Sequence, residues 1–374
     1  MMAEQGDQEV YQGLIDWYNN SWWKLTESEH LMPMIKAYVK PDEAEFLTGL
    51  PFRSTKVEDL AELKGMSVED ITPKLKKLAV RGFLFEDFRE NAPWYRFADS
   101  FFTFLRTVYW PGNKNEDVVA HAQHINKYFK DGWFDQFKEA HWRGLRTIPI
   151  EKTVEDTRAV LPFQDIVKII DDFEYYAVSA CPCRHRTNLD EDSKDCPHPL
   201  EVCLHFDDLG RYTVNNGLGR EITKEETFQI LKKSADAGLV HGIDSYEEKP
   251  DTICNCCNDA CMWFESYHKL GHSRSLSPSN YKIEVKAGTC RACGLCTRRC
   301  PMDALSLKFS EESTNKLNKA AVLDADLCIG CGVCAHKCPT DSLSLVQNAE
   351  IVRPPKTPRE FMGSFMADQL AAKK

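Results

Sequence analysis

The sequence predicts an α+β protein of several domains, and three observations carry this prediction. The chain has 374 residues, of which 43% are apolar, which is enough for two or three domains with ordinary cores. Helix-capping signals alternate with short strand patterns along most of the chain. Sixteen cysteines are present, and all lie between residues 181 and 338. We therefore expect a helical N-terminal region at 1–110, a helical connector at 111–161, a cysteine-rich α+β domain at 162–269, a duplicated cysteine module at 281–346, and a tail at 347–374.

The N-terminal region contains a short run of helices and strands. We expect a helix over Val57–Lys64, a turn at Gly65, a longer helix over 67–81, and strands over 83–88 and 94–97. This order resembles a winged helix of the MarR-like kind. The resemblance implies DNA binding by the second helix. Glu69 and Asp70 accompany the basic residues of that helix, so we expect it to be a scaffold for a protein partner.

The connector is predicted to be helical and rich in aromatic residues. Its histidines, His121, His124 and His141, have no cysteine or carboxylate at matching positions. We therefore expect them to be packed or surface residues and not metal ligands.

Charge and targeting signals narrow the class of protein. The formal net charge is −10, which argues against nucleic acid and favours a partner with a basic docking patch. The N-terminus has no basic and apolar signal segment, and no run approaches the roughly 18 apolar residues of a membrane span. We expect a soluble cytoplasmic protein. Because cytosolic thiols stay reduced, its cysteines indicate metal ligation and not disulfides.

The C-terminal module contains a repeated motif. Residues 290–307 and 328–345 both read C-x2-C-x2-C-x3-C-P and both end in an apolar strand. Three cysteines at this spacing form a tight loop around three corners of an iron–sulfur cubane, and the fourth cysteine reaches the other cluster. The spacing therefore predicts two [4Fe-4S] clusters with crossed ligands. The first is expected on Cys290, Cys293, Cys296 and Cys338, and the second on Cys328, Cys331, Cys334 and Cys300.

Gly294 and Gly332 occupy matching positions in the two motifs, and we expect them to let the backbone approach each cluster closely. The motifs resemble those of bacterial two-cluster ferredoxins over about residues 281–346. The resemblance implies a βαββαβ fold and one-electron transfer at low potential. Residues 308–319 are an insertion relative to that pattern, and we expect a surface hairpin there.

The middle domain contains the other eight cysteines in two groups. The first is Cys181, Cys183, Cys196 and Cys203, and the second is Cys254, Cys256, Cys257 and Cys261. We expect a strand at 175–180, a hairpin-like stretch at 202–214, a helix after Thr223 that ends at Gly238, a strand at 239–241, and a helix at 259–268.

Three interpretations of these groups stay open. In the first, each group binds a [4Fe-4S] cluster, which gives four clusters in all. In the second, the groups together bind one cluster or an atypical one, and some thiols are free or redox-active. In the third, one group binds zinc. Arg184 follows Cys183 directly and is expected either to raise the potential of an anionic cluster or to be a surface charge paired with nearby carboxylates.

The CPCR and CNCC motifs, followed by the dicluster motif, resemble multi-cluster ferredoxin-like proteins of strict anaerobes over about residues 160–346. The resemblance implies electron transfer within a larger redox assembly. We expect a redox partner protein, such as a flavoprotein or a reductase. We expect an electron-transfer subunit or donor of an oxidoreductase, in an oligomer or complex. The alternatives are a reductase whose middle-domain cluster binds substrate, and a redox-sensing winged-helix regulator.

Overall fold

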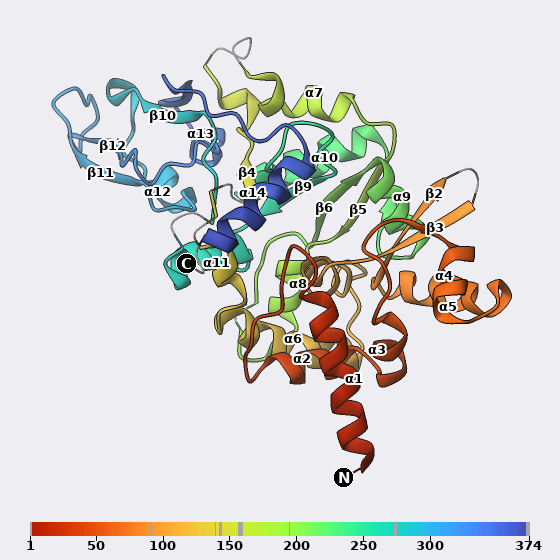
Figure 1. Cartoon of the computed structure of the whole chain (residues 1–374). Coiled ribbons are helices and arrows are strands. Elements are labelled where there is room, and N and C mark those ends of the chain that lie inside the picture. The colour runs from red at the N-terminus through yellow and green to blue at the C-terminus, as the bar shows by residue number, and fades with distance from the viewer. Residues whose placement is uncertain are drawn as a thin grey trace. The chain divides into compact units, whose positions relative to one another are not determined.

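The computed structural model describes residues 2–89, 92–138, 140–141, 144–155, 160–193, 195–272 and 275–371 (Figure 1). The chain divides into two compact units. Unit 1 consists of Met1–Glu139, Ala177–Glu201 and His205–Glu221, and unit 2 consists of Ala140–Tyr176, Val202–Leu204 and Ile222–Lys374. Among the described residues, no helix combines the length and apolarity needed to cross a bilayer.

The helical part of unit 1 is organised around buried aromatic rings. Its helices are α1 (Met2–Tyr18), α2 (Leu31–Tyr38), α3 (Pro41–Leu47), α6 (Glu116–Lys130), the π-helix η1 (Phe102–Thr107) and the 3-10 helix η2 (Trp133–Phe137). Trp23 is fully buried and packs against Phe101, Phe134 and Phe137 at centroid distances of 4.7, 5.2 and 5.3 Å. Trp23 is therefore a core residue, because a large ring buries much apolar area.

The next part of unit 1 places two helices against a three-stranded sheet. The elements are β1 (Thr55–Lys56), α4 (Val57–Lys64), α5 (Val68–Val80), β2 (Leu84–Arg89) and β3 (Ala92–Phe97), and the strand order is β1-β3-β2. The predicted helices and strands are confirmed. The Ser67 hydroxyl accepts the amide of Asp70 at 3.1 Å and so begins α5. Glu90 and Asn91, between the two predicted strands, lie outside the described residues.

Unit 1 also contains α8 (Pro182–Asn188), α9 (Asp207–Asn215), most of β5 (Tyr176–Ala180) and β7 (Arg220–Glu221), and β5 pairs with β7 in antiparallel fashion. The hairpin expected at 202–214 is wrong. Strand β6 (Glu201–Phe206) runs directly into α9, with Asp207 in a left-handed conformation at φ 44°. Leu209, Tyr212 and Thr213 are buried at helical spacing, which favours a helix there.

Unit 2 contains a sheet with the order β4-β8-β9-β6, to which β6 contributes Val202–Leu204. Strand β8 pairs in antiparallel fashion with both β4 and β9. The other strands are β4 (Leu145–Thr147), β8 (Val240–Asp244) and β9 (Thr252–Cys256). The helices are α7 (Ile166–Asp171), α10 (Lys224–Ala237) and α11 (Met262–Leu270), with 3-10 turns η3 (Glu151–Thr153) and η5 (Pro162–Gln164). The caps predicted for α10 are confirmed, since Thr223 accepts the amide of Glu226 and Gly238 has φ 89°.

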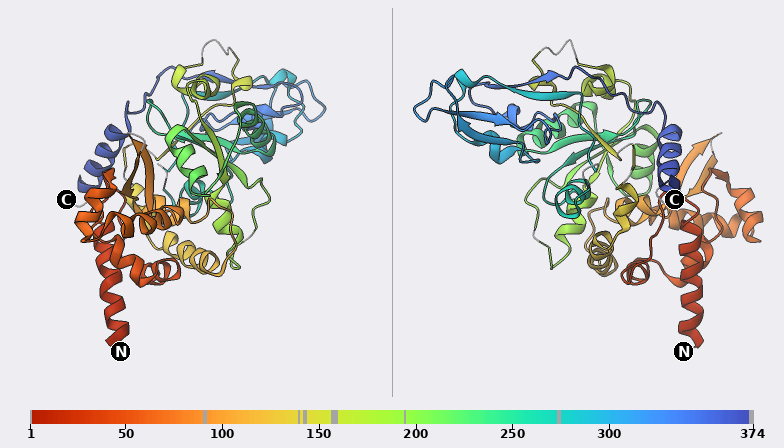
Figure 2. Two further views of the ribbon diagram at one scale, coloured as in Figure 1. Left: turned by 90° about the vertical axis from the view of Figure 1, so that its right-hand side faces the viewer. Right: turned by 60° about the vertical axis from the view of Figure 1, so that its left-hand side comes forward.

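The duplicated module lies within unit 2 and has the order βαββαβ. Its elements are β10 (Tyr281–Val285), the 3-10 turn η6 (Ala287–Thr289), α12 (Leu295–Arg299), β11 (Leu305–Phe309), β12 (Lys319–Leu323), α13 (Val333–His336) and β13 (Leu343–Gln347). Strand β10 pairs with β13, and β11 pairs with β12. The insertion at 308–319 forms the end of the β11–β12 hairpin, as expected. In both views of Figure 2 this hairpin, in light blue, lies at an outer edge of the module. Helix α14 (Pro358–Ala371) follows.

Candidate iron–sulfur site

The two cysteine motifs of unit 2 each form a loop that enters a short helix. Gly294 and Gly332 are the N-terminal caps of α12 and α13, with φ 69° and 78°. This left-handed conformation is one that only glycine adopts without strain, so each loop turns sharply between its second and third cysteine. The duplicated spacing therefore produces two loops of the same shape.

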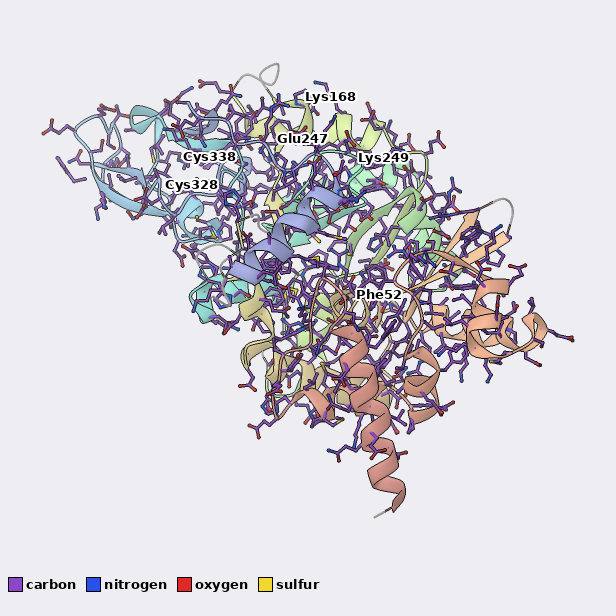
Figure 3. All side chains as sticks on the ribbon, viewed as in Figure 1. Phe52, Lys168, Glu247, Lys249, Cys328 and Cys338 are labelled. Carbon is purple, nitrogen blue, oxygen red and sulfur yellow. The ribbon has the colours of Figure 1, made fainter. Side chains whose placement is uncertain are left out.

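Two cavities of nearly equal size lie between these loops. One has about 310 Å³ of empty space and is lined by Cys300, Cys328, Cys331 and Cys334. The other has about 300 Å³ and is lined by Cys290, Cys293, Cys296 and Cys338. Each cavity thus takes three cysteines from one motif and the last cysteine of the other. We call them cavity A and cavity B, respectively. Figure 3 shows Cys328 and Cys338, one lining residue from each, within the module.

The walls of the cavities fit a [4Fe-4S] cluster. Apart from the thiols, the lining side chains are mainly apolar, such as Ile283 and Leu305 in cavity A and Leu343 in cavity B. Backbone amides point at sulfur: Ala304 N lies 3.3 Å from Cys300 Sγ, and Ala292 N lies 3.4 Å from Cys290 Sγ. Four thiolates in an apolar shell with amide donors are the ligands and hydrogen bonds that such clusters use.

Burial opposes ionisation of these thiols. It raises the pKa of Cys331 to about 12, and it raises the pKa of Cys296 and Cys300 above the usual range. The thiols of Cys300 and Cys331 in cavity A would therefore be neutral at pH 7 without a metal. Iron bound there would hold them as thiolates, because the positive charge of a metal reverses the cost of burying an anion.

Arg299, in the turn before Cys300, connects cavity A to helix α10. Its guanidinium donates to Ala235 O at 2.8 Å, to Asp236 O at 3.2 Å, and to Val333 O at 3.2 Å. Val333 lies between Cys331 and Cys334, and both thiols interact electrostatically with Arg299. This half-buried cation therefore fixes the second cysteine loop and lies beside the charge that a cluster would bring.

The Asp236 side chain adds a second link at the same end of α10. Its carboxylate lies 2.8 Å from His336 Nε2 and 2.5 Å from Lys337 Nζ. These bonds hold the pKa of Asp236 well below its usual range. Sequence reasoning missed both Arg299 and Asp236, because the contacts join residues about 60 to 100 positions apart, as the bonds of Arg299 and His336 show.

The first middle-domain group begins on α8 in unit 1. Cys181 is the N-cap of that helix, and its thiol interacts with the thiol of Cys183. Contact with Cys183 and burial raise the pKa of Cys181, while the charge and backbone amide of Arg184 act in the opposite direction. Cys196 is buried in the same unit, whereas Cys203 lies on the part of β6 that belongs to unit 2.

Arg184 and Arg186 are buried in unit 1, so the alternative that Arg184 is a surface charge is wrong. The Arg184 guanidinium donates to Pro199 O, and that of Arg186 donates to the Asn126 side chain and lies over the ring of Phe129 at 5.2 Å. A buried cation needs such partners because desolvation is costly. The basic residues after Cys183 are therefore part of the protein interior.

The second group gathers where β9 meets α11 in unit 2. Cys254 and Cys256 point to the same face of β9 because they are two residues apart on a strand. Cys256 interacts with the thiols of both Cys254 and Cys261, which raises its pKa well above the usual range, and Cys261 is the N-cap of α11. Helix α11 thus begins later than the expected residue 259. Cys257 follows β9 directly and is buried. Asn255 Nδ2 donates to Val202 O at 2.7 Å, which places Cys203 on the neighbouring strand.

Two basic side chains, one on α5 and one at its C-terminal cap, form ion pairs with buried carboxylates. Lys76 pairs with the buried Glu86 at 2.6 Å, and Arg81 pairs with the buried Glu43 at 2.5 Å. Lys74 and Lys77 stay exposed on a helix that also carries the exposed Glu69 and Asp70. The helix therefore does not present a uniformly basic face for a phosphate backbone.

The connector histidine His121 is a core residue. It is fully buried, and its Nδ1 lies 2.7 Å from the hydroxyl of Tyr109. Burial lowers the pKa of His121 to about 3, so the ring is neutral.

Comparisons with known proteins agree with the geometry of the C-terminal module. A family model described as a 4Fe-4S dicluster domain matches residues 289–342, which span both cysteine motifs. A search of curated proteins gives no match to the chain. The chain therefore contains a ferredoxin-like iron–sulfur module with 4Fe-4S clusters in its C-terminal part.

Proposed function

We propose that this protein transfers low-potential electrons through several [4Fe-4S] clusters, as a subunit or dedicated donor of a larger oxidoreductase complex. The observation that carries the proposal is the pair of equal, apolar cavities, each lined by four cysteines that the two motifs exchange. Clusters held in this way by four thiolates exchange single electrons, and the protein supplies their spacing, burial and hydrogen bonds.

The proposal extends to the middle domain. Cys181, Cys183, Cys196 and Cys203 form one ligand group, and Cys254, Cys256, Cys257 and Cys261 form the other, which gives four clusters in total. The contact between Cys181 and Cys183 and the contacts of Cys256 with Cys254 and Cys261 support these groups. Arg184 is proposed to raise the potential of the first. The setting is the cytoplasm of an anaerobe, with a flavoprotein or reductase as redox partner.

Two pairs of substitutions test the assignment of ligands. Cys290 and Cys338 line the same cavity, so Cys290→Ser with Cys338→Ser removes about four iron atoms per chain. Cys290 and Cys300 belong to the same motif but to different cavities, so Cys290→Ser with Cys300→Ser removes about eight. Equal losses from the two double variants would contradict the crossed arrangement.

The wild-type chain tests the function itself. After anaerobic purification we expect about sixteen iron atoms per chain, which corresponds to four clusters. About twelve iron atoms would indicate three clusters, and about eight would indicate clusters in the C-terminal module alone. Dithionite should reduce the clusters reversibly, as followed by electron paramagnetic resonance. Clusters that are absent, or that cannot be reduced and reoxidised, would exclude electron transfer.

A further inference from the structure

The β11–β12 hairpin departs from the two-cluster ferredoxin pattern. Its first strand has side chains that line both cavities and, further along, an apolar side chain that is exposed to solvent. Leu305, Leu307 and Phe309 point to one face of β11 because they alternate along the strand. Leu305 lines cavity A, Leu307 lines cavity B, and Phe309 is 69% exposed. Leu317, in the hairpin loop, is 62% exposed. Both exposed apolar side chains belong to the same hairpin, and patches of exposed apolar side chains mark interaction sites.

The hairpin loop is attached to the first cysteine loop. The Thr314 hydroxyl donates to Gly288 O at 2.8 Å, and Asn315 Nδ2 donates to Cys290 O at 2.7 Å. The same Asn315 amide bonds Lys319 O at 2.7 Å, which closes the loop upon itself. The apolar end of the hairpin is therefore held beside the ligands of cavity B.

The most exposed cysteine of the module lines cavity B. All sixteen cysteines lie in the described part of the chain, and Cys293 is the one classed as exposed. Each cavity also has two buried cysteines, Cys331 and Cys334 in cavity A and Cys290 and Cys296 in cavity B. Cys300, Cys328 and Cys338 are partly exposed. An electron-transfer partner gains the shortest approach to a cluster at the Cys293 edge.

The charges around this edge are mainly basic. Five basic and two acidic side chains are exposed on the first cysteine loop and the hairpin: Arg291, Arg298, Lys308, Lys316 and Lys319, with Glu311 and Glu312. Arg298 folds back over the loop, since a Cβ built on Gly294 would lie 3.3 Å from its guanidinium. The chain as a whole has a net charge of −10, so this local excess is opposite in sign to the rest of the molecule.

We propose that these residues, with Cys293, Phe309 and Leu317, form a docking surface for a redox protein whose own centre has an acidic rim and an apolar contact. The proposal rests on the proposed electron-transfer function. The net charge alone favours a basic partner, but docking follows the local field, which is positive here. Electron-transfer encounters are weak and small, with less than about 1,200 Å² buried, so a few apolar residues inside a ring of charges suffice.

The test measures the rate at which the reduced full-length holoprotein passes electrons to two protein probes. The probes are flavodoxin, which is acidic, and cytochrome c, which is basic, and stopped-flow absorbance follows each reaction at low and high salt. One variant carries Arg291→Gln and Arg298→Gln, and a second carries Phe309→Ser and Leu317→Ser. The matched control carries Lys168→Gln and Lys249→Gln, two exposed lysines of unit 2 that Figure 3 shows well away from Cys328 and Cys338.

For flavodoxin, the arginine variant should react about tenfold more slowly at low salt, and the difference should vanish at high salt, because steering by charge is screened. The apolar variant should be slower at both salt concentrations. Cytochrome c should not be slowed by the arginine variant, and the lysine control should match wild type with both probes. Unchanged flavodoxin rates in both variants, or slowing of cytochrome c by the arginine variant, would overturn the docking surface.

Iron content and the paramagnetic resonance spectrum of each variant are measured first. Intact clusters in every variant confine the result to docking. A wild-type protein that lacks reducible clusters would instead refute the proposed function, so the two failures are distinct.

Discussion

Gly330, in the second cysteine loop, offers a sharp test of how the fold holds cavity A. Its φ is 64°, and a Cβ built on it would lie 2.1 Å from Tyr281 O and 2.2 Å from Ser279 Oγ. The equivalent residue in the first motif is Ala292, which adopts φ 53° with an ordinary side chain. The two repeats therefore share the left-handed backbone, but the second repeat lacks space for a methyl group.

The loss of stability in Gly330→Ala has two causes, the left-handed backbone and the lack of space for a Cβ. A left-handed alanine costs about 1–2 kcal/mol, and Ala292 already carries that cost. Real Cβ contacts stay above 3.0 Å, so the alanine must also move the Tyr281 carbonyl away by nearly an ångström. That carbonyl begins strand β10, and the adjacent Ser279 bonds Gly330 O at 2.9 Å and Ile329 O at 3.0 Å. Losing these two bonds adds about 1 kcal/mol each, for a total of about 3–4 kcal/mol.

A loss of that size is a large part of the stability of an ordinary domain, which is about 5–15 kcal/mol. We therefore expect Gly330→Ala to lower iron content after anaerobic purification and to speed iron release to a chelator. The control is Ala292→Gly, in which relief of strain and the entropy of glycine nearly cancel, so that it stays within about 1 kcal/mol of wild type. Wild-type iron content and release rate in Gly330→Ala would refute the reasoning.

Three further predictions concern charged or titratable residues other than the cysteines. Burial keeps the folded-state pKa of His121 at about 3, below its ordinary value near 6.5, so its contribution to stability is full above pH 6.5 and is lost as the pH drops toward 3. Urea unfolding should therefore show a loss of about 2 kcal/mol in the free energy of unfolding between pH 7 and pH 5, and His121→Gln should remove this loss. An unchanged loss in that variant would exclude His121 as the cause. Arg299→Gln removes a cation beside Cys331 and Cys334, so a redox titration followed by paramagnetic resonance should show a lower midpoint potential for one cluster of the module; no change in either cluster would contradict it. Arg81→Ala leaves the carboxylate of Glu43, which is 4% exposed, without its cation, and it should lower the free energy of unfolding in urea by about 3 kcal/mol. The double variant Arg81→Ala with Glu43→Gln should lose less stability, and equal losses would show that the two residues are not coupled.

Local signals predicted the elements whose ends are written in the sequence. Helix α4 ends at Gly65, and α10 begins at Thr223 and ends at Gly238, because capping residues satisfy the terminal backbone groups wherever the helix lies. The stretch after β6 was predicted wrongly. Its start at Asp207 has no strong helix cap, and α9 forms because Tyr212 packs against Phe85 at 4.5 Å, a contact between distant segments.

In the candidate site too, contacts between distant segments could not be predicted from local sequence signals. The positions of Arg184 and Arg186 after Cys183 gave no sign of whether they are buried, because burial depends on partners such as Asn126 from another helix. The close approach of Gly330 to Tyr281, and the bonds of Arg299 to the end of α10, likewise involve residues far apart in the chain. No local pattern records such contacts.

By itself, the sequence determined that the C-terminal module is an iron–sulfur module. The spacing of cysteines in two copies of one motif states which thiols can surround a cubane, because a tight loop reaches only three corners and the fourth ligand must come from elsewhere. The tertiary structure decided what surrounds those thiols. It buried Cys331 and left Cys293 exposed, placed Arg299 beside cavity A, and fixed an apolar hairpin beside cavity B. Burial and charge arise from segments that meet only in the folded chain, so they are properties of packing and not of spacing.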